Sequence, residues 1–464
     1  MDIRDLKRTP SKGTVTRRSF LKTGAIVTTA LAAPTAAMRA ATNKNGKLGI
    51  LHIGVGGIGG MQRGKLRTHP KVEFVGLCDV DSQTLQKIGA EFPGAFKLKD
   101  YREAFSKYGD KFDAAIVDTP DFHHAPMMLT AMKHGKHIYG QKPLVHQLDE
   151  VRMIKEGLAA RPGLETQMGN QRACNTGRMQ AVEILRSNQL GRPIEAYVWT
   201  GHVRAGNYFV DAWSDYPPAE PVPANLDWNL WVGPIKKAMP YSKALAPRRW
   251  RTFWETGGGQ LADWGCHLLD ILYFAYDLDS PTAVMTHTPK PSGVAHSAHN
   301  HSVLTYRGGS RFAGDRFVVH YSDSGMTPSW SALGIPPQKV GSNYTMVVCE
   351  EGILLLQAGG NHKIFRKGKE VPNEPRPEVA PRDHWHDWVD RCFGVDKPIW
   401  TPFDIGVRIT EPALLAVKAT RYPGTELLWD GAAHRFTNNE DANETIVQRP
   451  YRDGFAPPNV SELG

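Results

Sequence analysis

Short apolar runs alternate with helical stretches from residue 48 onward. Residues 48–53 (LGILHI), 72–78 (VEFVGLC) and 112–117 (FDAAIV) have the length and composition of buried parallel strands. A helical pattern over 125–134 and a short strand over 137–139 come next. Strands that alternate with helices in this way predict an α/β domain built on a parallel sheet.

The pattern changes after about residue 170, and all 12 tryptophans lie between Trp199 and Trp429. We expect a second domain of the α+β class with a large, mostly antiparallel open sheet. Its predicted strands include Glu195–Thr200, His301–Tyr306, Phe317–Tyr321 and Tyr344–Cys349. The stretch 204–251 is rich in Pro and Trp and predicts extended loops over the mouth of a site.

Two features are expected near the carboxyl terminus. Residues 402–419 predict a helix, and Pro412 inside it is expected to kink or break that helix. The polar residues 431–464 predict an extended tail that wraps either the body of the chain or a neighbouring subunit. The predicted organisation is therefore a leader (1–40), a first domain (45–170), a second domain (171–430) and this tail.

The leader has the parts of an export signal. A basic segment that contains Arg17 and Arg18 precedes a weakly apolar stretch at 24–37, and small residues follow it. The paired arginines resemble a twin-arginine signal, which implies the twin-arginine export machinery as a partner and a periplasmic or otherwise exported location. The alternative is an amphipathic helix, which Pro34 and several small or polar residues disfavour.

Composition excludes several classes of protein. No run approaches the ~20 apolar residues of a membrane-spanning helix, so we expect no stable span. The formal net charge is +9, and residues 1–40 hold eight Lys or Arg against two Asp, which leaves +3 for the rest. A mildly basic chain without a basic stripe does not predict nucleic-acid binding.

Five scattered cysteines allow one disulfide but no disulfide framework. We predict no metal site, because the His-x-His pairs are isolated.

A glycine motif follows the first predicted strand. Gly54, Gly56, Gly57, Ile58 and Gly59 belong to GVGGIG, a GxGxxG sequence. Such glycines permit a tight turn, close approach of a pyrophosphate and close packing of the next helix, whose amino terminus attracts phosphates. The motif alone is weak, but here it lies between a strand and a helix, as a Rossmann dinucleotide-binding domain requires.

Asp79 ends the second strand, about 20 residues after the glycine motif. A carboxylate there accepts from the ribose hydroxyls and repels a 2′-phosphate, so NAD is favoured over NADP as the cofactor. The alternative is a turn residue at a strand end. Thr119, Pro120, Gln141 and Lys142 follow later strands and are expected to border the nicotinamide, although Lys142 would otherwise be a solvated loop residue.

Asp263 and His267 lie four residues apart in a predicted helix and so face the same way. A histidine suits a general base, and a neighbouring carboxylate can orient the ring. The alternative is that Asp263 caps the helix and His267 is a core residue. Spacing alone leaves both interpretations open.

Eight motifs together resemble the Gfo/Idh/MocA oxidoreductases, in particular an exported bacterial branch. They are GVGGIG (54–59), the strand end at Asp79, TPDFHHA (119–125), QKPL (141–144), TQMGNQ (166–171), LDWNLWVGP (226–234), GGGQLADWGCHLLD (257–270) and WDG…TNNEDAN (429–443). The resemblance covers nearly all of the chain after the leader. It implies catalytic roles for Lys142, Asp263 and His267, and a homo-oligomer. It also implies a place for His124 near the cofactor, where the residue either binds the cofactor or has a structural role. Gln141 stands where the family usually has Glu.

The resemblance also frames the expected chemistry. His267 would take a hydroxyl proton, Lys142 would stabilise the oxygen and Asp263 would hold or polarise His267. Asn170, Gln171, Arg178 and Trp250 are candidates for substrate binding, or for capping and core packing.

We expect a periplasmic NAD(P)-dependent oxidoreductase that acts on a sugar or glycoside hydroxyl by hydride transfer. The cofactor would be tightly bound, because an exported enzyme meets little free NAD. The alternatives are a redox-neutral NAD-dependent glycosidase or lyase, and a non-catalytic nucleotide or sugar sensor.

Overall fold

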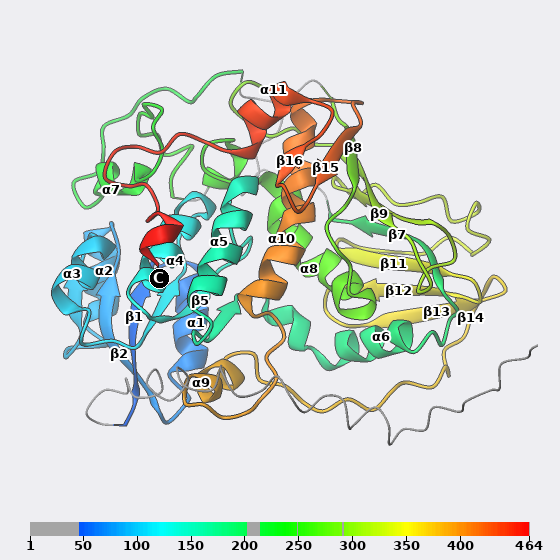
Figure 1. Ribbon diagram of the computed structural model, residues 1–464, viewed down its shortest axis with the longest axis horizontal. Coiled ribbons are helices and arrows are strands. Elements are labelled where there is room, and N and C mark those ends of the chain that lie inside the picture. The colour runs from blue at the N-terminus through cyan, green and yellow to red at the C-terminus, as the bar shows by residue number, and fades with distance from the viewer. Residues whose placement is uncertain (1–45, 202–213, 248, 290–291, 464) are drawn as a thin grey trace, which may run out of the picture. The chain divides into compact units, whose positions relative to one another are not determined.

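A computed structural model describes residues 46–201, 214–247, 249–289 and 292–463, so the predicted leader lies outside the described residues. Two sheets dominate this part of the chain (Figure 1). One has six parallel strands and the other ten strands. The predicted order of an α/β part followed by an α+β part is confirmed.

The first sheet has the strand order β3-β2-β1-β4-β5-β6 of a Rossmann fold. Its strands are β1 (Leu48–Ile53), β2 (Val72–Cys78), β3 (Phe96–Leu98), β4 (Ala114–Val117), β5 (His137–Gly140) and β6 (Thr166–Met168). Its helices are α1 (Ile58–Leu66), α2 (Ser82–Gly89), α3 (Tyr101–Tyr108), α4 (His124–Lys133) and α5 (Leu148–Ala160). Every residue of β1 is buried, which explains its uninterrupted apolar run. The carboxyl ends of these strands form one edge, where the predicted site residues begin.

The second sheet has the order β14-β13-β12-β11-β7-β10-β9-β8-β15-β16. Its strands are β7 (Pro193–Trp199), β8 (Ala283–His287), β9 (His301–Arg307), β10 (Arg316–Ser322), β11 (Tyr344–Cys349), β12 (Ile353–Gln357), β13 (His362–Arg366), β14 (Lys369–Glu370), β15 (Leu427–Asp430) and β16 (Arg435–Phe436). Its pairs are antiparallel except β7 with β10, so the predicted character of the sheet and all four predicted strands are confirmed.

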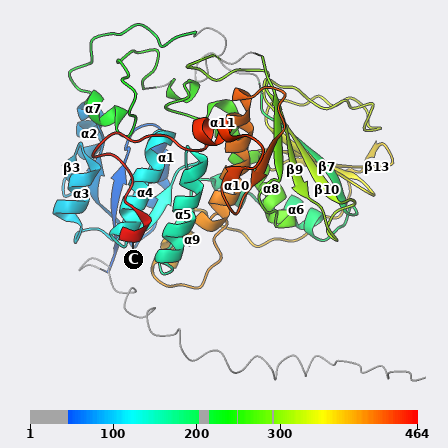
Figure 2. The same ribbon diagram turned by 45° about the horizontal axis from the view of Figure 1, so that its top comes forward.

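Three helices pack on this sheet, namely α6 (Thr176–Arg186), α8 (Gly259–Tyr276) and α10 (Phe403–Lys418) (Figures 1 and 2). Of the two outcomes expected at Pro412, a kink or a break, the break does not occur, because α10 continues through this residue. Pro412 removes one backbone hydrogen bond. The helix is buried along most of its length against α5 and α8, and this packing offsets the loss.

Later parts of the chain return to the first sheet. Helix α9 (His386–Cys392) buries Trp388 against residues of β1 and β4, and His384 hydrogen-bonds to Tyr139 of β5 at 3.0 Å. After α11 (Glu440–Ala442) the tail also returns, and Lys133 of α4 pairs with Glu462 at 2.5 Å. The tail thus wraps the body of its own chain. Residues from the predicted second domain and from the tail contact the first domain, across the domain boundaries predicted from the sequence.

Two further observations concern the described residues. All five cysteines are free thiols. None of the described helices has both the length and the apolar character of a membrane span.

Candidate active site

The glycine loop after β1 has room for backbone only. Gly54 has φ +83°, and a Cβ there would lie 2.6 Å from the carbonyl oxygen of Asp118. A Cβ at Gly59 would lie 2.4 Å from the carbonyl oxygen of Gly54. Helix α1 begins at Ile58 without a side-chain cap, and the Gly59 and Gly60 N–H groups donate to the carbonyl oxygens of Gly56 and Gly57 at 2.9 and 3.2 Å. The positive end of the helix dipole at this terminus favours a phosphate. The loop therefore fits the pyrophosphate of a dinucleotide.

Asp79 supports this loop. Its Oδ2 accepts a hydrogen bond from the Val55 N–H at 3.0 Å, and its Oδ1 accepts from the Asp81 N–H at 3.0 Å. Burial raises the pKa of the Asp79 carboxyl. The residue therefore shapes the turn as well as lining the site, so the turn-residue interpretation and the ribose-binding one are compatible.

A cavity of about 840 Å³ runs along the carboxyl edge of the first sheet. Seven predicted cofactor residues and one predicted substrate residue line it: Gly54, Gly56, Gly57, Ile58, Asp79, Thr119, Pro120 and Trp250. The opposite wall comes from the loops before α8, with α7 (Trp228–Val232) contributing Leu230 and Trp231. Within the described residues, the prediction that 204–251 covers the site is confirmed. The volume and the glycine loop suit a dinucleotide.

A pair that the sequence analysis missed lies beneath the glycine loop. His52 Nε2 and Asp118 Oδ2 are 2.9 Å apart, and both side chains are fully buried. A Cβ at Gly59 would come within 2.9 Å of the His52 ring. A histidine inside a fully apolar strand was the available signal, since a buried polar group needs a partner.

Lys142 and Asp263 meet where the two halves of the chain join. Lys142 Nζ donates to Asp263 Oδ1 at 2.5 Å and to the Asp263 carbonyl oxygen at 2.8 Å. Arg251 Nε lies 3.3 Å from the same Oδ1. Asp263 lies on the second turn of α8, four residues after its first residue, and so does not cap the helix. One carboxylate thus serves two cations, and Arg251 connects this cluster to the cavity that it lines.

His267 is held by Asn170. The Asn170 Nδ2 donates to the Cys266 carbonyl oxygen at 2.8 Å and to Asp270 Oδ2 at 3.0 Å, so the Asn170 Oδ1 faces His267 Nδ1. Because this amide oxygen is an acceptor, His267 Nδ1 carries the proton and the Nε2 lone pair is left for a substrate. The prediction is that Asp263 holds or polarises the His267 ring. Asn170 and not Asp263 makes the contact that holds the ring. Asp263 acts on His267 through its charge.

The same contacts overturn two substrate assignments. Asn170 is fully buried among its partners, and Arg178 forms a buried ion pair with Asp270. Both residues therefore belong to a buried chain of polar side chains that ends at His267, and neither faces a substrate. The sequence could not distinguish these roles, because a buried Asn and a ligand-binding Asn look alike.

Burial, and next the charge of Lys142, hold the pKa of His267 well below its usual range. The ring is a neutral imidazole at ordinary pH, which is the form that accepts a proton.

The remaining predicted residues differ in position. His124 is fully buried, with its ring nitrogens 2.8 Å from the Pro143 carbonyl oxygen and 2.9 Å from the Thr119 carbonyl oxygen. Of the two roles expected for His124, the structure favours the structural one, because both ring nitrogens bond to loops of the site and neither is left for a cofactor. His123, its neighbour, lines the cavity instead. Gln141 is buried, and Gln171 is half-buried at the start of a single helical turn.

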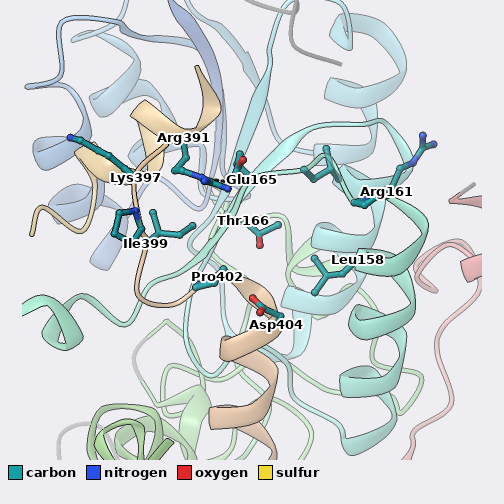
Figure 3. A pocket seen from close by; sticks show the side chains of 12 residues that line it. Leu158, Arg161, Glu165, Thr166, Arg391, Lys397, Ile399, Pro402 and Asp404 are labelled. Carbon is teal, nitrogen blue, oxygen red and sulfur yellow. Dashed lines mark hydrogen bonds and ion pairs between the residues drawn. The ribbon is translucent and has the colours of Figure 1, made fainter. Parts of the chain in front are cut away.

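A second hollow of about 410 Å³ lies at the amino end of β6 (Figure 3). Arg391 Nε pairs with Glu165 Oε2 at 3.1 Å there, and Lys397 Nζ pairs with Asp390 Oδ2 at 2.6 Å. This edge is opposite to the glycine loop, so the hollow is not the cofactor site. No group of three or more His, Cys, Asp or Glu side chains in the described part of the chain is arranged to hold a metal ion.

Two family models match this chain. The one described as "Oxidoreductase family, NAD-binding Rossmann fold" matches residues 48–167, and the one described as "Oxidoreductase family, C-terminal alpha/beta domain" matches residues 175–316.

Curated relatives match over shorter stretches. Inositol 2-dehydrogenase of Rubrobacter xylanophilus is 27% identical over 148 residues, which is 32% of this chain and 42% of that protein. Glycosyl hydrolase family 109 protein 1 of Bacteroides fragilis is 32% identical over 113 residues, which is 23% of this chain and 24% of that protein. The chain thus spans less than half the length of either relative.

Among solved structures, the WlbA dehydrogenase of Bordetella pertussis, in complex with NADH and UDP-GlcNAcA, has a TM-score of 0.58. It is 17% identical, and the match covers 83% of this chain and 99% of that one. This likeness concerns the fold. Together with the two family matches and the glycine loop, it leads to one conclusion. The chain belongs to the Gfo/Idh/MocA oxidoreductase family and carries that family's NAD(P)-binding Rossmann fold.

Proposed function

We propose that the protein is an NAD-dependent oxidoreductase that acts on a hydroxyl group of a sugar or glycoside. One observation carries the proposal: Lys142, Asp263 and a tautomer-locked His267 gather beside a cavity shaped for a dinucleotide. These residues come from distant parts of the sequence, and a protein that only bound nucleotide would not need them together. Their assembly therefore favours an enzyme over a sensor.

Each side chain of this cluster has a distinct role in the proposed reaction. His267 Nε2 accepts the proton of the substrate hydroxyl, while Asn170 keeps the Nδ1–H in place. Lys142 donates a hydrogen bond to the oxygen as negative charge develops on it, and Asp263 holds the ammonium group in position. When bound, the nicotinamide ring would supply the hydride acceptor. Burial and the charge of Lys142 lower the pKa of His267, so the imidazolium form is disfavoured.

Preference for NAD over NADP follows from the charge at one end of the cavity. Asp79, Asp81 and Asp100 line that end, together with Lys99. Asp79 follows β2, where the adenosine ribose would lie, and a 2′-phosphate dianion placed there would meet its carboxylate. This carboxylate supports NAD, while the nearby Arg102 is paired with Asp100.

A carbohydrate substrate is supported by the names of similar proteins. One is an inositol dehydrogenase, and the WlbA dehydrogenase was solved with a UDP-sugar acid. The 32% identity with a glycosyl hydrolase family 109 protein favours a second candidate, a redox-neutral glycosidase. In that reaction the sugar is transiently oxidised, the glycosidic bond is cleaved by elimination, water adds to the double bond that forms, and the carbonyl is reduced again by the hydride taken up in the first step. No net redox change results.

The proposed location of the protein is the periplasm, and its proposed assembly is a homo-oligomer. The twin-arginine pattern at Arg17 and Arg18 supports export to the periplasm with the cofactor already bound. A cofactor carried out in this way must be retained tightly, because little free NAD would replace it. We also propose a homo-oligomer, which light scattering of the purified protein would test.

The first experiment is mass spectrometry of the nucleotide released when the purified protein is denatured. Near-stoichiometric NAD or NADH is expected, and the His267→Ala variant should carry the same nucleotide but turn over no substrate. Sugars and glycosides are then screened with and without a carbonyl acceptor. Oxidised sugar identifies the oxidoreductase, and cleaved glycoside without net oxidation identifies the glycosidase. A protein that binds neither NAD nor NADP would refute both.

A further inference from the structure

The carboxyl-terminal segment passes directly over one end of the cofactor cavity. In Figure 1 the red trace leaves α11, runs past α7 and ends beside α4. Phe455 of this segment lines the cavity together with Asp79, Lys99 and Tyr101. The last 17 residues, 448–464, therefore include part of the wall of the site.

The segment is anchored to the Rossmann domain on one side. Arg449 donates to the Phe122 carbonyl oxygen at 2.5 Å and pairs with Glu150 Oε1 at 3.1 Å. Tyr451 donates its hydroxyl proton to the same Glu150 Oε1 at 2.8 Å. Glu150 is 1% exposed, so these are buried, charge-assisted bonds that hold the segment firmly.

On its other side the segment is tied to the loop that forms the opposite wall. Arg452 donates to Asn229 Oδ1 at 2.9 Å and to the Asn229 carbonyl oxygen at 2.7 Å. The Arg452 N–H donates to the Pro234 carbonyl oxygen at 3.0 Å, and Tyr451 forms a β-bridge with Ile235. The segment therefore links both walls of the cavity.

Phe455 packs against two guanidinium groups. The Arg102 guanidinium is 4.0 Å from the ring centroid and the Arg452 guanidinium 4.1 Å. Arg102 also donates to the Gly454 carbonyl oxygen at 2.5 Å. These contacts hold the aromatic ring of Phe455 at the cavity wall.

The position in the sheet identifies which part of a dinucleotide lies there. The glycine loop follows β1 at the centre of the sheet, and Asp79 follows β2 on the side of β3. Because the carboxylate after β2 takes the adenosine ribose, the β2–β3 side is the adenosine side. Arg102 stands in the first turn of α3, immediately after β3. Phe455 thus lies at the adenosine end.

We propose that residues 448–456 form a strap that completes the adenosine subsite, with Phe455 covering the adenine nucleoside of the bound dinucleotide. This inference rests on the proposed binding of NAD and adds a reason for its retention. The adenosine end leaves only when the strap detaches from Asn229 or from Glu150. Dissociation is therefore slow without any change in the contacts of the pyrophosphate or the nicotinamide.

The test compares three ligands on the full-length protein by calorimetry and stopped-flow displacement. In Phe455→Ala, the affinity for NAD and for ADP-ribose should fall at least about fivefold, with a matching rise in the dissociation rate. The affinity for nicotinamide mononucleotide, which lacks the adenosine half, should stay unchanged. Arg452→Gln removes the clamp on Asn229 and should also accelerate NAD release.

A matched control is Phe393→Ala. Phe393 is also half-buried, lies 4.8 Å from the ammonium group of Lys71, and does not line the cavity. It should leave all three affinities unchanged.

The outcomes separate the two proposals. Suppose that the wild type binds NAD and that Phe455→Ala binds ADP-ribose with the same affinity as the wild type. The strap is then refuted, and the proposed function stands. Equal weakening of the mononucleotide would also refute the strap, because the effect would then be general. A wild type that binds no dinucleotide refutes both. Should Phe455→Ala not fold, the NAD dissociation rate of Arg452→Gln decides.

Discussion

Lys142 Nζ lies 2.5 Å from Asp263 Oδ1 and 2.8 Å from the carbonyl oxygen of the same residue. Lys142 follows β5 of the Rossmann sheet, and Asp263 lies on α8 beneath the second sheet, 121 residues later. Their side chains are 14% and 12% exposed. This pair is an ionic contact through which the cofactor half of the chain meets the half that carries His267.

Replacement of Lys142 by methionine should stop turnover without unfolding the protein. Asp263 keeps Arg251 as a cation, so no buried carboxylate is left without a counter-charge. The loss of a donor to the substrate oxygen should lower kcat by about 10²–10³-fold. NAD affinity should change by less than about threefold, because the glycine loop is untouched. Steady-state kinetics measures kcat, and calorimetry measures NAD affinity. The control is Lys107→Met, because Lys107 is an exposed surface residue. A kcat near that of the wild type would remove Lys142 from the mechanism.

Asn170→Ala should separate kcat from KM. The variant loses the acceptor that holds the Nδ1–H of His267 and leaves Asp270 with one partner fewer. An unmade buried hydrogen bond costs about 1–3 kcal/mol, which corresponds to a fall in kcat of about 5–150-fold. The KM for substrate should stay within about twofold. Asn459→Ala, at an exposed position whose side-chain amide bonds to Glu462, is the control. A raised KM with an unchanged kcat would instead support the substrate role first predicted for Asn170.

Asp79→Asn should relax the preference for NAD. The amide keeps an oxygen that can accept one of the two backbone N–H groups and removes the negative charge that a 2′-phosphate would meet. We expect the ratio of NADP affinity to NAD affinity to rise about tenfold or more, as measured by calorimetry. Asp404→Asn, in the second hollow, provides a charge-matched control far from the loop. An unchanged ratio would mean that Asp79 serves the turn alone.

The free energy of unfolding should fall as the solution is acidified below about pH 6.5. Burial lowers the pKa of His123, His296 and His384 to about 3 in the folded protein. The unfolded chain binds protons on these residues near pH 6.5 and the folded one does not, so acid favours unfolding. Each contributes a slope of about 1.4 kcal/mol per pH unit between pH 6.5 and the folded value.

Urea titrations at pH 7.5, 6.5 and 5.5 measure this slope. His384→Gln should remove one histidine's share of it, because Gln carries no titrating group. A slope that is the same in the variant and the wild type would contradict the assignment of His384 as a buried neutral ring.

The Rossmann half was accessible from sequence because its signals are local. The bounds of β1 and β2 equal the predicted apolar runs, since a buried parallel strand must be apolar on both faces. The glycine motif could also be predicted from the sequence, because no side chain fits at Gly54 or Gly59. Pro412 shows the limit of such rules. Its local penalty is real, yet packing against α5 and α8 keeps α10 continuous.

The sequence by itself determined the fold class, the cofactor loop and the placement of Asp263 and His267 on one helix face. Helical periodicity and strand burial act between near neighbours, so they are visible in the order of residues. Only the tertiary structure decided that Lys142 contacts Asp263, that Asn170 holds His267 and that Phe455 reaches the cavity. Those contacts join residues that lie about 100 to several hundred positions apart, and their geometry depends on how the two sheets pack together.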